Sequence, residues 1–228
     1  GSNGFESDND AAGSTNSPLT NATFSNVTIL GPKQTATTTI NTNFKRGIHI
    51  RRSSQQDIIN SIISGFPTGL RLESANSEAG FLTNNTLSLR NNLISGMTKS
   101  VDSVTTAYQS ILDTFTKLNT ILVNNTDLKL TDPYATNVNA VPLAGSPALT
   151  GADFTNVDSY FTKVAYKGAF GTDNWTKCWC EFDPKNADYS KPINYTSNIS
   201  DFTFTVTDNV VNFTAPTGTN YSYKWNFG

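Results

Sequence analysis

The side chains that could carry acid–base chemistry gather in one short part of the chain. Between positions 49 and 73 they are His49, Arg51, Arg52, Asp57, Arg71 and Glu73. Cleavage of a glycosidic bond would need two carboxyl groups, or a basic side chain within reach of the proton that it removes. Glutamate is scarce, and the whole chain has only Glu6, Glu73, Glu78 and Glu181. We therefore expect structural roles for this group, with Arg51 and Glu73 as a surface ion pair, rather than catalysis within it.

A second group of side chains could hold a metal ion. Glu6, Asp8 and Asp10 place three carboxylates within five positions, and calcium prefers oxygen ligands of this kind. The run lacks the glycine and the closing glutamate of a complete calcium loop. A solvated acidic turn is therefore the preferred interpretation, and calcium is the one cofactor that the sequence suggests.

Three aromatic side chains could contact a glycan. Tyr166, Trp175 and Trp179 would offer rigid, amphipathic rings for stacking on a sugar if they are exposed. They belong to an aromatic stretch, residues 161–184, at the end of the main domain. This position favours a role as an aromatic cap that seals the end of the fold.

A pattern that occurs three times indicates which elements position these side chains. Its copies are Phe24–Gly31, Ile58–Gly65 and Leu89–Gly96. Each has a large apolar residue two positions before an Asn, an Ile three after it and a Gly five after it. This near-constant spacing and the many β-branched residues predict a solenoid of stacked parallel strands. The repeated Asn26, Asn60 and Asn91 would form a structural ladder at one turn, bonding backbone groups of adjacent coils.

Strands of a second kind lie between the repeats and carry most of the candidate acid–base residues. They are residues 47–52 and 69–74, in which apolar and polar residues alternate. The inward positions should be Ile48, Ile50, Leu70 and Leu72. Stacking these strands places His49 beside Arg71 on the outer face. Two positions further along, it places Arg51 beside Glu73.

Past the third repeat the spacing of apolar residues changes to three or four. Over residues 98–123 this spacing predicts one amphipathic helix of about six turns, on the flank or over the end of the coils. Residues 191–228 contain three alternating segments joined by turns. We therefore expect residues 1–190 to form the C-terminal part of an all-β, parallel β-helix, and residues 191–228 to begin a second module.

Composition argues against several classes of partner. A net charge of −2 offers no basic surface for nucleic acid or for an anionic membrane. No apolar run reaches the roughly 20 residues of a membrane-spanning helix. Cys178 and Cys180 are the only cysteines, and they are too close in sequence for an unstrained bridge. We interpret them as small apolar side chains rather than as a metal or redox site.

Several separated blocks resemble large secreted or cell-surface proteins of Bacteroidota. The blocks, which follow one another in the same order as in those proteins, are Asn3–Asp10, Phe24–Thr28, Ile50–Arg52, Asn60–Ser61, Gly65–Gly69 and Tyr166–Trp175. In addition, Gly145–Ala148 resembles a run near the end of right-handed parallel β-helix proteins. The resemblance spans about residues 3–190. It implies a right-handed β-helix that the type IX system exports to the cell surface or beyond. The chain departs from this group at Cys178 and Cys180.

The end of the chain resembles a PKD domain, which is an immunoglobulin-like β-sandwich. The hallmark Tyr-x-Trp-x-Phe-Gly of that domain matches Tyr223–Gly228. The resemblance implies that residues 191–228 are a partial PKD-like module. Such modules act as spacers or as carbohydrate contacts on extracellular proteins.

We expect a non-catalytic structural or adhesive segment of a large extracellular or cell-surface protein. Its rigid polar surface would contact glycans or other surface proteins. Two alternatives stay open. Parallel β-helices often host polysaccharide lyases and glycoside hydrolases, so the chain could belong to an enzyme whose active site lies mostly upstream. It could also be a subunit of a fixed surface assembly, in which the edge of the PKD-like module pairs with another chain.

Overall fold

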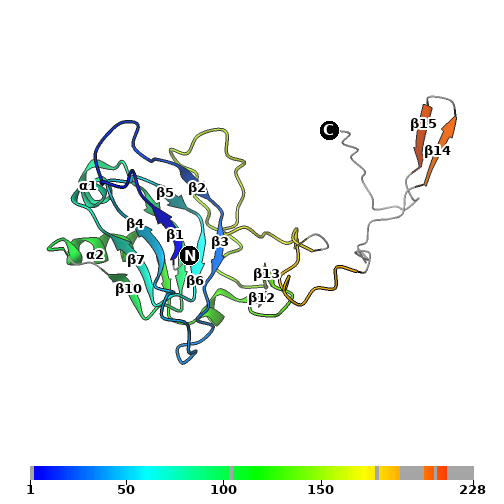
Figure 1. Ribbon diagram of the computed structural model, residues 1–228, viewed down its shortest axis with the longest axis horizontal. Coiled ribbons are helices and arrows are strands. Elements are labelled where there is room, and N and C mark those ends of the chain that lie inside the picture. The colour runs from blue at the N-terminus through cyan, green and yellow to red at the C-terminus, as the bar shows by residue number, and fades with distance from the viewer. Residues whose placement is uncertain (1–2, 103–104, 178–179, 191–202, 208–209, 215–228) are drawn as a thin grey trace. The chain divides into compact units, whose positions relative to one another are not determined.

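The computed structural model describes residues 3–102, 105–177, 180–190, 203–207 and 210–214. The chain divides into two compact units, Gly1–Trp175 and Thr176–Gly228. The boundary that we expected at residue 190 lies inside the second unit. In the first unit, the described strands form three parallel sheets and one antiparallel hairpin, and Figure 1 shows the parallel strands side by side.

Each parallel sheet collects one strand from successive turns of the chain. Sheet A has the order β1 (Asn3–Ser7), β4 (Arg46–Ile50), β7 (Thr68–Leu72) and β10 (Lys99–Asp102). Sheet B has the order β2 (Thr23–Ser25), β5 (Asp57–Ile59) and β8 (Leu89–Arg90). Sheet C has the order β3 (Thr28–Leu30), β6 (Ile62–Ser64), β9 (Leu93–Ser95) and β11 (Thr120–Leu122). The chain thus passes from sheet A to B to C in repeated coils, which confirms the predicted parallel β-helix. Its handedness stays a prediction.

Alternation along the strands fills the inside of the coils with apolar columns. In sheet A, Phe5 pairs with Ile48, Ile48 with Leu70, and Leu70 with Val101. Phe5 is 9% exposed and the other three are at most 1% exposed. Branched aliphatic side chains pack well on such a pleated surface. All four inward positions predicted for β4 and β7 are buried.

Backbone conformation explains why Asn and Gly recur in the repeat. The Asn positions follow β2, β5 and β8 and have φ of 57°, 50° and 59° at Asn26, Asn60 and Asn91. Asn adopts this left-handed conformation more readily than most residues with a side chain. At Gly65, where φ is 70°, a Cβ would lie 2.9 Å from the carbonyl oxygens of Gly31 and Lys33. Only glycine fits there without displacing the neighbouring coil.

The helix predicted over residues 98–123 is only partly correct. Helix α2 runs from Tyr108 to Leu118, with β10 before it and β11 after it. β10 is a strand because Val101 pairs with Leu70 and extends an apolar column, and such tertiary pairing outweighs helical spacing. In the fourth coil, α2 takes the place between sheets A and C that a strand of sheet B has in the other coils. Its Phe115 is fully buried in the core.

The connections hold shorter elements. They are α1 (Ala75–Ala79), the π-helix η1 (Gly80–Asn84), the 3-10 helix η2 (Asn125–Leu128), and the hairpin of β12 (Leu130–Asp132) and β13 (Asn139–Pro142). A second apolar cluster covers the outer face of sheet C, where Ile62 and Leu93 contact Phe170 and the hairpin region. We expected the aromatic stretch 161–184 over an open end of the coils. Its described part up to Phe170 lies along their side instead, because the outer face of sheet C is itself apolar.

The described strands of the second unit form a hairpin. β14 (Thr203–Thr207) and β15 (Val210–Thr214) are antiparallel, with Val206 opposite Val211. These two strands were predicted from their alternating residues. The third predicted segment and the Tyr223–Gly228 run lie outside the described residues, so the PKD-like module stays a prediction.

Candidate functional site

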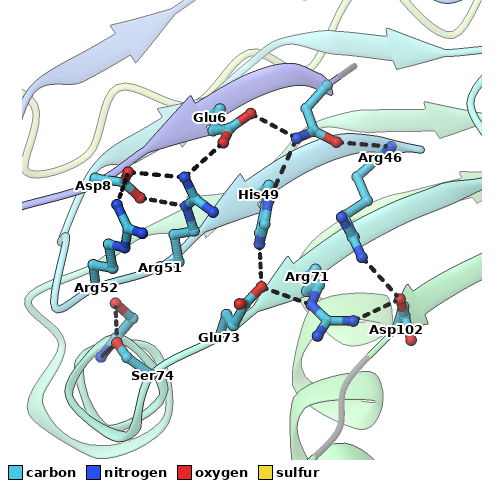
Figure 2. A network of polar contacts seen from close by, with 12 residues as sticks. Glu6, Asp8, Arg46, His49, Arg51, Arg52, Arg71, Glu73, Ser74 and Asp102 are labelled. Atoms are coloured by element: carbon cyan, nitrogen blue, oxygen red, sulfur yellow. Dashed lines mark hydrogen bonds and ion pairs between the residues drawn. The ribbon is translucent and has the colours of Figure 1, made fainter. Parts of the chain in front are cut away.

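Most of the candidate acid–base residues lie on the outer face of sheet A (Figure 2). The strand register places Glu6 beside His49, His49 beside Arg71, and Arg71 beside Asp102. Neighbouring strands are about 5 Å apart, so long side chains in such a row meet directly. The predicted placement of His49 beside Arg71 is confirmed. We call the charged side chains of this face the sheet A network.

Glu73 joins one half of the sheet A network. Its Oε2 lies 2.6 Å from Nε2 of His49 and 2.9 Å from Nε of Arg71. Nη1 of Arg71 donates to Oδ2 of Asp102 at 3.0 Å, and Nη2 of Arg46 lies 3.7 Å from the same oxygen. Figure 2 shows these groups as one continuous chain of contacts across β4, β7 and β10.

Arg51 joins the other half, and its partners correct one prediction. Its Nε and Nη2 donate to the two carboxylate oxygens of Asp8 at 2.6 and 3.0 Å, and Nη2 lies 3.0 Å from Oε1 of Glu6. Arg52 adds a contact to Asp8 at 3.2 Å. The prediction of an ion pair between Arg51 and Glu73 is therefore wrong, although their strands stack as predicted. Asp8 competes better because it offers both oxygens to the guanidinium in a bidentate arrangement.

The sheet A network is balanced in charge. Its cations are Arg46, Arg51, Arg52 and Arg71, and its anions are Glu6, Asp8, Glu73 and Asp102. Each of these eight described groups has at least one partner of opposite charge within 4.0 Å. Such mutual pairing leaves each charged group committed to another side chain of the same face.

Burial and hydrogen bonds set the ionisation of the network. Burial lowers the pKa of His49, which is only 4% exposed, and this outweighs the hydrogen bond to Glu73. Burial alone would raise the pKa of Glu73, but the hydrogen bonds from His49 and Arg71 outweigh it and lower that pKa. The hydrogen bond to Asp8 raises the pKa of Arg51. At neutral pH a neutral imidazole therefore lies beside an ionised carboxylate.

The three carboxylates considered for calcium have other partners. Glu6 and Asp8 contact Arg51, and the side chain of Asp10 accepts hydrogen bonds from the backbone and hydroxyl of Ser14. These bonds lower the pKa of Asp10. Among the described residues, no group of three or more His, Cys, Asp or Glu side chains is arranged to hold a metal ion. A calcium site at these positions stays a prediction.

The three Asn residues of the repeat bind a later segment of the chain. Nδ2 of Asn26 donates to the carbonyl of Tyr166 at 2.7 Å, that of Asn60 to Asp153 at 3.0 Å, and that of Asn91 to Gly151 at 2.8 Å. Asn91 also donates to Oδ1 of Asn60 at 2.7 Å. We call residues 148–169 the side strap. It follows the turn between sheets B and C across three coils.

A second, inner row of amides was missed by the sequence reasoning. Oδ1 of Asn92 accepts from the backbone N of Ser61 at 2.8 Å, and Oδ1 of Asn119 accepts from the backbone N of Asn92 at 3.0 Å. Asn92 is fully buried and Asn119 is 8% exposed. The signal was the residue directly after each repeated Asn, which is Ser61 in the second copy and Asn92 in the third. Buried polar groups of this kind must be hydrogen-bonded, and here the amide oxygens accept from backbone N–H groups of the turns.

The aromatic residues considered for glycan contact are placed differently from one another. Trp175 is 50% exposed, stacks on Phe170 at a centroid distance of 5.4 Å, and donates from Nε1 to the carbonyl of Ala169 at 2.7 Å. Tyr166 is half-buried in the side strap. Trp179 and its neighbour Cys178 lie outside the described residues, and Cys180 has no disulfide partner among the residues that the structure describes. A role in glycan contact stays a prediction for all three aromatic residues.

Asp57, the remaining candidate, lies away from sheet A. It lines a polar groove of about 740 Å³ on the outer face of sheet B, together with Arg90 and Asp158. Burial raises the pKa of Asp57, although Ser88 and Thr23 donate hydrogen bonds to it. One wall is the side strap, which Arg90 holds by an ion pair to Asp153 at 3.0 Å. This wall could not be predicted from the sequence, because Arg90 and Asp153 are 63 positions apart.

Asp102 and Arg46 were also missed as members of the sheet A network. Asp102 was assigned to a helix, although a signal for a strand was present. Gly65 is followed three positions later by β7, and Gly96 is followed at the same distance by β10. Reading the third repeat as continuing in this way would have placed Asp102 beside Arg71.

Within the described part of the chain, the structure contains no helix with the length and apolar character to cross a membrane.

Comparison with known proteins identifies the fold family. No curated protein and no solved structure matches the chain. Residues 1–179 match the family model described as the pectate-lyase-like β-helix domain. Because that match covers most of the 228 residues and agrees with the three parallel sheets, the chain belongs to the pectate-lyase-like β-helix domain family.

Proposed function

We propose that the chain is a non-catalytic, structural and adhesive segment of a larger extracellular or cell-surface protein. In this proposal the β-helix presents a rigid polar surface to glycans or to other surface proteins. The location, and export by the type IX system of a Bacteroidota cell, follow from the resemblance of the sequence blocks. They are part of the proposal.

The neutralised sheet A network is the observation that carries the non-catalytic part. A general base must reach the proton that it removes. His49 is 4% exposed, its Nε2 contacts Glu73, and its Nδ1 lies 3.4 Å from the amide of Asn3. The arginines beside it are each committed to a carboxylate. A substrate would have to displace several of these contacts before any of the groups could act.

The adhesive part is supported by the rigid setting of Trp175. Its ring is half exposed, and both the stack on Phe170 and the hydrogen bond to Ala169 fix its orientation. An aromatic ring held in this way loses little conformational entropy when a sugar stacks on it. The strand ladders beneath it keep the surrounding surface rigid.

A second candidate function is polysaccharide cleavage. The matched family is described as pectate-lyase-like, and the contact of His49 with Glu73 beside Arg71 has the residue types of an acid–base site. In this candidate, further coils would supply the rest of an active site. The outer face of sheet A would then be one wall of the substrate groove.

Two measurements on the same purified protein separate the candidates. The chain is incubated with acidic and neutral polysaccharides, including pectate, with and without calcium, while new reducing ends and unsaturated products are followed. It is also applied to a glycan array, together with Trp175→Ala and His49→Gln. We expect no cleavage, and binding that Trp175→Ala weakens at least about tenfold while His49→Gln leaves it unchanged. Cleavage that His49→Gln abolishes would refute the non-catalytic proposal in favour of the enzyme.

A further inference from the structure

Lys33 is a buried lysine whose ammonium group contacts, within the described part of the chain, only neutral oxygens. It follows β3 and is 9% exposed. Its Nζ donates to Oγ1 of Thr98 at 2.8 Å and contacts the carbonyl oxygen of Gly96 at 3.4 Å. Among the described residues, no carboxylate lies within ion-pair distance of it. This differs from the sheet A network, where each charge has a counter-charge.

The ammonium lies beside a cavity whose described lining residues include no acidic side chain. The cavity has a volume of about 310 Å³ and lies between the loop after β3, the turn after β9 and the turn after β11. Its described polar lining includes Gln34, Thr98, Asn124 and Thr126. The carboxylate of Asp127, the nearest acidic residue in sequence, accepts from the backbone N of Asn124 at 2.9 Å and is not part of the lining.

The walls of this cavity are fixed by contacts between distant parts of the chain. Nδ2 of Asn125 donates to the carbonyls of Lys33 and Gln34 at 2.8 and 2.9 Å. Oδ1 of Asn125 accepts from the hydroxyl of Ser95 at 2.9 Å. The fourth coil therefore holds the loop after β3 in place, and Lys33 in turn reaches across to the third coil. A ligand would meet a preformed site.

We infer that this cavity binds an oxyanion group, which is a carboxylate, a sulfate or a phosphate, through the ammonium group of Lys33. Burying a charge is costly unless a counter-charge or several hydrogen bonds compensate for it. An ammonium has three donors, and the two neutral oxygens leave one of them for a ligand. The surrounding amides and hydroxyls can donate further hydrogen bonds to the same anion. The inference concerns a site separate from sheet A and from Trp175, and it does not depend on the proposed function.

The volume and the lining restrict the ligand further. A cavity of about 310 Å³ is at the small end of the range for ligand sites, so it fits one small acidic group with a short substituent. Val123, which is 81% exposed, supplies an apolar part of the lining. The anion could be a free ion or a group on a larger molecule, and different probes distinguish these sources.

Titration of the intact chain with small probes tests the inference. Sodium acetate, sodium sulfate and sodium phosphate are added at constant ionic strength, with sodium chloride as the reference and acetamide as the uncharged counterpart of acetate. The unfolding temperature and the amide chemical shifts are followed in the wild type, in Lys33→Met and in Lys99→Met. Lys99 is exposed on β10, so its variant removes the same charge without altering the cavity.

We expect at least one of the oxyanions to bind wild type and Lys99→Met alike, with chemical-shift changes confined to residues 33–36, 96–98 and 123–126. Lys33→Met should bind it at least about tenfold more weakly, and acetamide should cause no change. Preference for acetate points to a carboxylate ligand, and preference for sulfate or phosphate points to an ester or free ion. Equal responses in all three proteins, or wild-type shift changes outside these residues, would overturn the inference. If Lys33→Met does not fold, the same comparison is made with Thr126→Ala, which should weaken binding in the folded chain.

Discussion

Nδ2 of Asn91 donates a hydrogen bond of 2.7 Å to Oδ1 of Asn60 in the preceding coil. The same Oδ1 accepts from the backbone N of Asp153 at 2.8 Å, and Nδ2 of Asn60 donates to the carbonyl of Asp153 at 3.0 Å. Asn60 is fully buried. One amide therefore links two coils to the side strap, and its contribution to stability can be measured.

Replacing Asn60 should destabilise the β-helix strongly. Asn60→Ala removes these bonds, leaves buried partners unpaired and places alanine at a φ of 50°. We expect the free energy of unfolding to fall by about 2–4 kcal/mol, measured by urea denaturation. Asn60→Gly is the matched control because it also loses the amide but adopts the left-handed conformation freely, so it should be less damaging by about 1 kcal/mol. A loss below about 0.5 kcal/mol for Asn60→Ala would contradict the linking role.

The coils could be predicted from the sequence because their constraints are local. Asn60 and Gly65 are demanded by the backbone of two turns, and the alternation around Ile48 and Leu70 fixes which face is buried. The pattern recurs in three of the four coils, so it appears as a repeat. The placement of His49 beside Arg71 followed from the same register.

The side strap and the partner of Arg51 could not be predicted, because their contacts leave little trace in the sequence. The side strap binds through the carbonyls of Gly151, Asp153 and Tyr166, and every residue type has a carbonyl. Arg51 had acidic neighbours on both sides, and only side-chain geometry decides that it pairs with Asp8. The length of α2 was overestimated because the spacing of apolar residues near Val101 suits a helix as well as a strand.

The position of α2 in the fourth coil leads to a second prediction. Phe115 is fully buried in the core, whereas Leu118 on the same helix is 41% exposed to solvent. Phe115→Ala should lower the free energy of unfolding by about 3–5 kcal/mol, because it leaves a cavity between α2 and the coils. Leu118→Ala, the control, should cost less than about 1 kcal/mol in the same urea denaturation. Similar losses for both variants would mean that α2 does not complete the core.

The sheet A network predicts a pH dependence around His49. Burial holds the folded pKa of His49 below 6.5, while the unfolded chain titrates near 6.5. Between those two values the unfolded state binds more protons, so the free energy of unfolding should fall as the pH is lowered from 7 through 6.5. Glu73 stays ionised there, because its pKa is below 4.5. His49 is the only histidine in the chain, so His49→Gln should flatten this slope.

Urea denaturation at several pH values between 5.5 and 7.5 checks this prediction. A slope of equal size in wild type and His49→Gln would assign the effect to other groups. A rise in stability on acidification would mean instead that the contact with Glu73 dominates and that the folded imidazole takes up a proton more readily than the unfolded one.

Lys167 should destabilise the folded chain at neutral pH. It lies in the side strap, is 7% exposed, and has no hydrogen bond or ion pair from its ammonium group to any described residue. Burial lowers its pKa from 10.5, so the unfolded chain binds more protons between the folded pKa and 10.5, and wild-type stability should rise with pH over that interval. Lys167→Met removes this penalty and keeps a long apolar side chain. We expect a gain of about 1 kcal/mol at pH 7 that shrinks as the pH approaches 10.5.

The control for Lys167 is Lys163→Met in the same strap, because Lys163 is exposed. Its free energy of unfolding should stay within about 0.5 kcal/mol of the wild type at every pH. Loss of stability in Lys167→Met at pH 7 would show that the ammonium is compensated in the folded chain, and an equal gain in both variants would assign the effect to net charge. A gain confined to Lys167→Met would show that the strap is held by its backbone bonds to Asn26, Asn60 and Asn91 against the cost of a buried amine.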